Sequence, residues 1–78
     1  MKHIDTTYIA KADTTVDTIQ LDNGKICYLY NKDGDTSLLP SLDALLKFLN
    51  GDVSVRMGCF PTEKADEMIE GFEKIFND

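Results

Sequence analysis

Residues 19–39 read IQLDNGKICYLYNKDGDTSLL, and this stretch decides the fold. It holds two turn signals, Asn23-Gly24 and Asp33-Gly34, each lying between residues suited to strands. Asn, Asp and Gly tolerate the positive φ angles that a two-residue type I′ turn requires. Each dipeptide therefore predicts a tight β-hairpin.

The length of each turn also predicts a register. A two-residue turn at Asn23-Gly24 gives the pairs Leu21 with Ile26, Gln20 with Cys27, and Ile19 with Tyr28. On this register the more apolar face, expected to meet the core, consists of Ile19, Leu21, Ile26, Tyr28 and Tyr30. The same reasoning at Asp33-Gly34 pairs Asn31 with Thr36 and Leu29 with Leu38, and it predicts a strand from about Asp35 to Leu39.

The segments on either side of this stretch add a strand and a helix. Residues Ile4–Ala10 are rich in β-branched and aromatic side chains, which favours a further strand. After Pro40, Ser41 is a suitable N-cap for a helix, and Asn50-Gly51 is a typical C-terminal stop. Between them, apolar residues recur at helical spacing: Leu42, Leu45, Leu46 and Leu49.

The last third of the chain predicts one strand and one helix. Alternation over residues 53–60 predicts a strand whose buried set is Val53, Val55, Met57 and Cys59. Pro61-Thr62 then begins a helix, with Thr62 as its N-cap. The apolar side of this helix comprises Ala65, Met68, Ile69, Phe72, Ile75 and Phe76.

The expected fold is therefore α+β, with the element order β-β-β(-β)-α-β-α. It is an antiparallel sheet of four to five strands with two helices packed on one face. The 78 residues are too few for two cores, so the chain 1–78 is expected to form a single domain.

Charge excludes several classes of partner. Fourteen acidic residues against eight basic ones give a formal net charge of −6, which argues against direct binding to nucleic acid or to an anionic membrane. No apolar run approaches the roughly 20 residues that span a bilayer. The first residues lack the pattern of a signal peptide, so we expect a cytoplasmic protein with two free thiols.

The acidic residues of the last helix form the candidate partner-binding surface. They lie on the side opposite the apolar residues and are Glu63, Asp66, Glu67, Glu70 and Glu73. A solvated outer face is the ordinary explanation for such a pattern. The functional interpretation is a surface that attracts a basic protein, as nucleic acid would.

Chemistry on the single histidine and the two cysteines is the other candidate. His3, Cys27 and Cys59 are residue types that zinc favours, and each falls on a different predicted strand. A metal would stabilise a domain this small, but the closely spaced cysteine pairs typical of zinc sites are absent from the sequence. No catalytic constellation stands out, so the expected protein is not an enzyme and has no cofactor, with zinc as the open alternative.

The turn-rich run from Leu21-Asp22-Asn23-Gly24 through Asn31-Lys32-Asp33-Gly34-Asp35, together with the acidic helix, resembles small phage-encoded anti-CRISPR proteins that act on Cas nucleases. The resemblance is one of size, charge and architecture, and it transfers no functional residue. It implies an inhibitor that acts by occupancy in the cytoplasm of a bacterial host, blocking guide or target DNA loading on a Lys- and Arg-lined channel.

Three alternatives remain open at this point. The first is a zinc-binding protein in which the metal stabilises the sheet or shapes a binding surface. The second is a cysteine-dependent enzyme that uses His3 with Cys27 or Cys59. The third is a host regulatory or structural domain that forms a homodimer through its exposed sheet face.

Overall fold

A computed structural model describes residues 1–76 of the chain. Five strands are present in that range: β1 (Lys2–Ile9), β2 (Thr14–Gln20), β3 (Ile26–Lys32), β4 (Asp35–Leu39) and β5 (Gly58–Pro61). The helices are α1 (Leu42–Leu49) and α2 (Ala65–Phe76), with short 3₁₀ turns η1 (Val53–Val55) and η2 (Thr62–Lys64). The expected α+β class and order of elements are confirmed.

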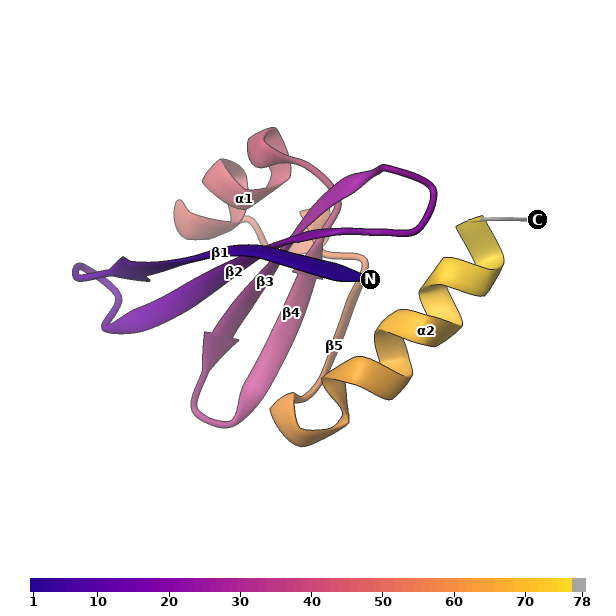
Figure 1. Ribbon diagram of the computed structural model, residues 1–78. Helices are drawn as coiled ribbons and strands as arrows, with labels where there is room; N and C mark the ends of the chain where they lie inside the picture. Colours follow the sequence, from indigo (N-terminus) through magenta and orange to yellow (C-terminus); the bar gives the residue numbers. More distant parts are fainter. Residues whose placement is uncertain (77–78) are drawn as a thin grey trace.

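The five strands form one antiparallel sheet in which each strand pairs with its neighbour in sequence, in the order β1-β2-β3-β4-β5 (Figure 1). Strands β1 and β5 are therefore the two edges. The register of β1 shifts between His3 and Asp5, where a bulge interrupts its pairing with β2.

The Asp33-Gly34 turn is confirmed in detail. Asp33 has φ 55° and Gly34 has φ 82°, so both central residues lie in the region that a type I′ turn requires. The pairs Asn31 with Thr36 and Leu29 with Leu38 form as the turn predicts.

The Asn23-Gly24 prediction is wrong by one residue. Only Gly24 has a positive φ (88°), and its N–H donates to the Leu21 carbonyl while the Leu21 N–H donates to the Lys25 carbonyl. The loop thus contains three residues, Asp22–Gly24, and Ile19 pairs with Cys27 instead of Tyr28.

This shift changes which side chains share a face, because a slip of one residue reverses every side chain of a strand. Ile19 and Leu21 are buried with Cys27 and Leu29, whereas Ile26 is exposed. The two tyrosines, Tyr28 and Tyr30, pack toward the opposite face.

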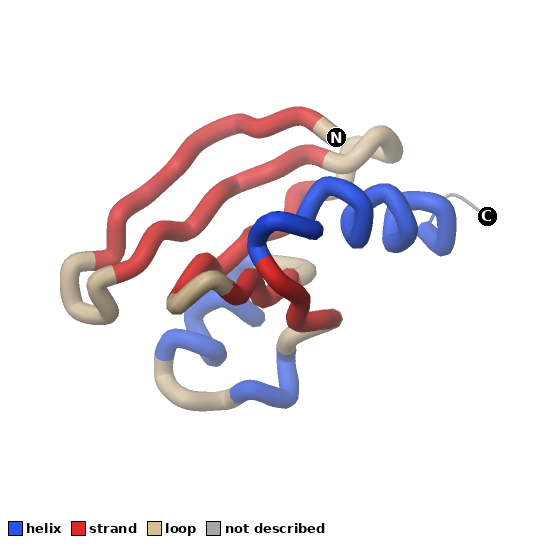
Figure 2. The backbone as a smooth tube through the Cα atoms, turned by 90° about the horizontal axis from the view of Figure 1, so that it is seen from below, coloured by secondary structure: helices blue, strands red, loops and turns tan. Residues whose placement is uncertain are grey.

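The sheet is apolar on both faces, and each helix covers a different one. The α2-side core contains Ile19, Leu21, Cys27, Leu29, Leu38, Phe60 and Ile69, while the α1-side core contains Val16, Leu39, Ala44 and Leu45. Adjacent residues Leu38 and Leu39 are both fully buried, one in each core, because successive strand residues point to opposite faces. The two helices therefore differ from the expected placement on one face, and Figures 1 and 2 show them on different sides of the sheet.

Helix α1 begins and ends as its sequence predicts. The Ser41 hydroxyl accepts a hydrogen bond from the Ala44 N–H, and Gly51 follows the helix with φ 103°. Its apolar stripe is only partly used, since Leu45 is buried whereas Leu42, Leu46 and Leu49 are exposed. Tyr30 packs edge-on against Phe48 with ring centroids 5.0 Å apart.

The predicted strand over residues 53–60 is mostly wrong. Asp52 accepts hydrogen bonds from the Ser54 N–H and hydroxyl, which favours the 3₁₀ turn η1 over an extended chain. Pairing with β4 begins only at Gly58, so β5 covers only Gly58–Pro61. Its burial is reversed from the prediction, with Phe60 buried and Cys59 exposed.

The final helix starts later than its sequence suggests. Thr62 lies in η2 and does not act as a side-chain cap, and α2 begins at Ala65. On the predicted apolar side, Ile69 is buried and Phe72 is partly buried, while Met68 and Ile75 are exposed. The side chain of Phe76 lies outside the described part of the chain.

Candidate functional site

The outer side of η2 and α2 presents four carboxylates to solvent. Glu63, Asp66, Glu67 and Glu70 are all exposed, because the helix packs Ala65, Ile69 and Phe72 against the core of the sheet. Their exposure agrees with the helical periodicity of the sequence.

Glu73 is the exception among the five predicted residues. It is only 7 % exposed and faces the interior, where its Oε1 lies 3.3 Å from the Met1 ammonium and accepts a 3.3 Å hydrogen bond from the Asp22 N–H. The Met1 ammonium also contacts Asp22 Oδ1 at 2.9 Å. Glu73 therefore links α2 to the β2–β3 loop and is not available at the outer surface.

Two further carboxylates extend the acidic side of α2. The Thr62 N–H donates a 2.8 Å hydrogen bond to the Gly34 carbonyl, and Asp35 pairs with Pro61 across β4 and β5. The β3–β4 turn with its exposed Asp33 and Asp35 consequently lies beside the start of α2, as Figure 1 shows. We call the combined region the acidic surface: Asp33, Asp35, Glu63, Asp66, Glu67 and Glu70.

The acidic surface contains no close ion pair among residues 1–76. None of its six carboxylates forms an ion pair with another residue in the range 1–76. Lys64 lies between them in sequence but does not pair with any of them. Carboxylates grouped without close ion pairs repel one another, and a cationic partner would relieve that repulsion.

A chain of polar side chains crosses the sheet and ends next to the acidic surface. Thr36 donates a 2.8 Å hydrogen bond to Asn31 Oδ1, so the 2.9 Å contact between the hydroxyls of Thr62 and Thr36 has Thr62 as its donor. Asn31 Nδ2 donates to Asp17 Oδ2 at 2.9 Å, and Thr6 donates to Asp17 Oδ1 at 2.7 Å. We call this set, from Thr6 on β1 to Thr62 in η2, the polar strip.

Asp17 is the common acceptor of the polar strip. Partial burial raises its pKa, but hydrogen bonds from Thr6, Asn31 and His3 outweigh burial and hold the pKa below its ordinary value of 3.8. Asp17 is therefore ionised at neutral pH and anchors both neighbouring strands.

Sequence reasoning missed the polar strip, although a signal for it exists. Asp17 lies two residues before the buried Ile19, and Asn31 lies two residues after the buried Leu29. Residues two apart in a strand point to the same face of the sheet. Asp17 and Asn31 therefore lie on the face that buries Ile19 and Leu29, and they extend that apolar row with polar side chains.

The structure does not bring together the three predicted zinc ligands. Cys27 is buried in the α2-side core, whereas Cys59 follows the opposite alternation on β5 and is exposed. His3 Nε2 contacts Thr6 Oγ1 at 2.8 Å and Asp17 Oδ1 at 3.4 Å. Within residues 1–76 no three His, Cys, Asp or Glu side chains converge as a metal-binding group.

Neither cysteine is activated by His3. Burial raises the pKa of the Cys27 thiol, with a smaller opposing effect from Lys25, so Cys27 is a neutral thiol at pH 7. The contacts of His3 are with Thr6 and Asp17.

Comparison with known proteins yields no relatives: no family model, curated protein or solved structure matches this chain. Over the described residues, neither helix has the length and apolar character needed to traverse a bilayer.

Proposed function

We propose that this protein is a non-catalytic inhibitor that occupies the basic surface of a nucleic-acid-handling protein. The observation behind this proposal is the acidic surface, whose six carboxylates are exposed and lack ion pairs among residues 1–76. A cluster of this kind attracts a Lys- and Arg-rich partner in the way that phosphate groups do.

The specific partner that we propose is a Cas nuclease in the cytoplasm of a bacterial host, as the resemblance to anti-CRISPR proteins implies. Such enzymes hold nucleic acid in positively charged channels. An acidic protein bound there competes with guide or target DNA, and this inhibition involves no bond-making or bond-breaking step.

The test compares two triple variants with equal changes in charge. In the first, Glu63, Glu67 and Glu70 on the acidic surface are changed to Lys. In the matched control, the exposed Asp5, Asp43 and Asp52 outside that surface are changed to Lys. Each triple raises the formal net charge from −6 to 0.

DNA cleavage by a purified Cas nuclease with its guide RNA is measured with each protein, at a series of salt concentrations. We expect stoichiometric inhibition by the parent chain, with affinity falling roughly tenfold or more between 50 and 200 mM salt. The first triple should lose about 100-fold in affinity and the control less than about threefold. Equal losses in both triples, or affinity independent of salt, would contradict the proposal.

A homodimer is the second candidate, and one observation favours it. Leu42, Leu46 and Leu49 follow one another at helical spacing on α1 and are exposed, so this helix retains an apolar stripe outside the core. Sedimentation equilibrium of the parent chain and of Leu46→Glu tests this candidate. A dimer that the substitution dissociates supports it, and a parent monomer at millimolar concentration removes it.

A further inference from the structure

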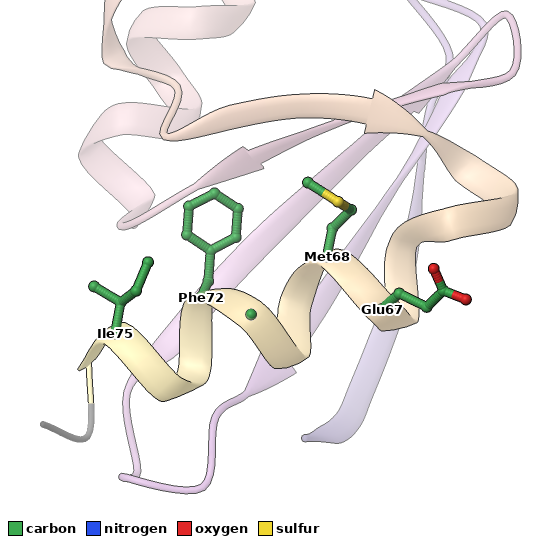
Figure 3. A pocket seen from close by; sticks show the side chains of 5 residues that line it. Glu67, Met68, Phe72 and Ile75 are labelled. Atoms are coloured by element: carbon green, nitrogen blue, oxygen red, sulfur yellow. The ribbon is translucent and has the colours of Figure 1, made fainter.

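An apolar groove lies along α2, next to the acidic surface. Its volume is about 240 Å³, and it is lined by Glu67, Met68, Gly71, Phe72 and Ile75. Figure 3 shows Met68, Phe72 and Ile75 pointing to the same side of the helix, with Glu67 at the end nearer the helix start. Met68 is 41 % exposed and Ile75 is 69 % exposed, so these side chains reach solvent although they are apolar.

Close packing against the described residues does not explain why a glycine stands at position 71 in this groove. Glycine in the middle of a helix is unfavourable relative to alanine, so its presence is usually related to close packing. A Cβ atom placed on Gly71 would meet no atom within 4 Å. Gly58 provides the contrast, since its Cβ would lie 3.0 Å from Phe72 Cζ. The described part of the chain therefore leaves the space above Gly71 open.

The size of the groove and the charge around it define its occupant. Pockets for small molecules are usually about 300–1,000 Å³, so a groove of about 240 Å³ suits a single large side chain better. Glu67 belongs both to the groove and to the acidic surface, and exposed Glu63 and Glu70 lie one helical turn before and after it. An apolar side chain entering here would lie beside the Glu67 carboxylate, at the margin of the acidic surface.

We propose that the groove binds one apolar or aromatic side chain of a partner protein, inserted above Gly71 and flanked by lysine or arginine. This inference rests on the proposed function and adds to it the anchor residue of the basic partner. Interfaces commonly concentrate their affinity in such a buried anchor, while the charged surroundings supply orientation and rate of association.

The test uses three capped tripeptides as probes: Lys-Phe-Lys, Lys-Gly-Lys and Glu-Phe-Glu. Each is titrated into the isotope-labelled full chain, and backbone amide and methyl NMR signals are followed. We expect Lys-Phe-Lys to shift the Gly71 amide and the methyl groups of Met68 and Ile75. The other two peptides should bind at least tenfold more weakly at these positions. Equal shifts from Lys-Gly-Lys, or no shift at the groove with any peptide, would overturn the inference.

Two substitutions of Gly71 separate binding from folding. Gly71→Leu fills the groove, and Gly71→Ala fills it only slightly, while both replace glycine with better helix formers. We expect the Tm of both variants to equal or exceed that of the parent. Affinity for Lys-Phe-Lys should fall at least tenfold in Gly71→Leu and less than threefold in Gly71→Ala. Unchanged affinity in Gly71→Leu would overturn the inference.

The same variants distinguish failure of this inference from failure of the proposed function. If charge reversal abolishes nuclease inhibition and Gly71→Leu does not affect it, the groove inference fails and the proposed function stands. If Gly71→Leu and charge reversal both leave inhibition intact, both fail. A dimer of the parent chain that Gly71→Leu dissociates would mean that a second copy occupies the groove, which also overturns the inference.

Discussion

Helices α1 and α2 lie on opposite faces of one sheet, and each packs an apolar side against it, yet their charged residues are balanced differently. On α1, Lys47 Nζ lies 3.1 Å from Asp43 Oδ2, so this helix supplies a counter-charge of its own. On the α2 side, Glu63, Glu67 and Glu70 have no such pair within the described range. The comparison teaches that acidic composition alone does not distinguish the two helices, whereas the presence or absence of an ion pair on the helix does.

The largest expected effect is the loss in free energy of unfolding when a core residue on either side of the sheet is truncated to alanine. Ile69 of α2 is 1 % exposed within a core of seven buried residues, whereas Leu45 of α1 is 7 % exposed within a core of four. We expect Ile69→Ala to lower the free energy of unfolding by about 3–4 kcal/mol and Leu45→Ala by about 2–3 kcal/mol. Urea denaturation measures both. A greater loss in Leu45→Ala would show that the α1 side is the more tightly packed one.

Replacing either of two glycines on the α2 side with alanine should change the stability in opposite directions. Gly58→Ala places a Cβ 3.0 Å from the Phe72 ring, so we expect a loss of about 1 kcal/mol from overpacking. Gly71→Ala meets no neighbour, so we expect a gain of about 0.5–1 kcal/mol from helix propensity. Thermal denaturation of both variants measures the difference. A destabilised Gly71→Ala would mean that the space above this residue is needed for folding.

Lowering the pH is expected to have a smaller effect on the free energy of unfolding, through the polar strip on the α2 face of the sheet. The pKa of Asp17 is lowered in the folded protein, so its contribution to stability is complete above 3.8 and is lost as pH falls through the folded-state pKa. Because Asp17 is partly exposed, we expect this loss to be under about 1 kcal/mol. Urea denaturation at pH 5 and pH 2.5 measures it, and Asp17→Asn is the control. If Asp17→Asn shows the same loss, other carboxylates account for it.

The smallest expected effect is the coupling within α1. A double-mutant cycle with Asp43→Ala and Lys47→Ala should give about 0.3–0.5 kcal/mol, because the pair is exposed and spaced i,i+4 on a helix. The coupling should disappear in 1 M salt. Zero coupling at low salt would remove the contrast with α2, since neither helix would then have its charge balanced internally.

The sequence predicts one hairpin correctly and misplaces the other, for a physical reason. Both Asn-Gly and Asp-Gly suit a two-residue turn, but Asn-Gly also suits a three-residue loop in which only glycine has a positive φ. The choice at Asn23-Gly24 depends on burial: the observed register buries Cys27 with Ile19 and leaves Ile26 exposed. Local sequence does not contain that information, since it depends on the later packing of α2.

The candidate site is predictable to a similar extent. Helical periodicity is enough to place Glu63, Asp66, Glu67 and Glu70 on the outer side of η2 and α2. Periodicity also assigned Glu73 to this set, but its contact with the Met1 ammonium depends on residues far away in sequence. The addition of Asp33 and Asp35 likewise depends on the pairing of β4 with β5, which brings distant segments together.

The order β1-β2-β3-β4-β5 has a consequence for how quickly the chain folds. Every strand joins the strand that precedes it, so the sheet grows by closing short loops, with the segment containing α1 as its longest connection. Local pairing of neighbouring strands favours rapid folding, so we expect the sheet to form faster than the seconds typical of β-sandwiches. The sheet can therefore form soon after synthesis, before the last helix packs against it.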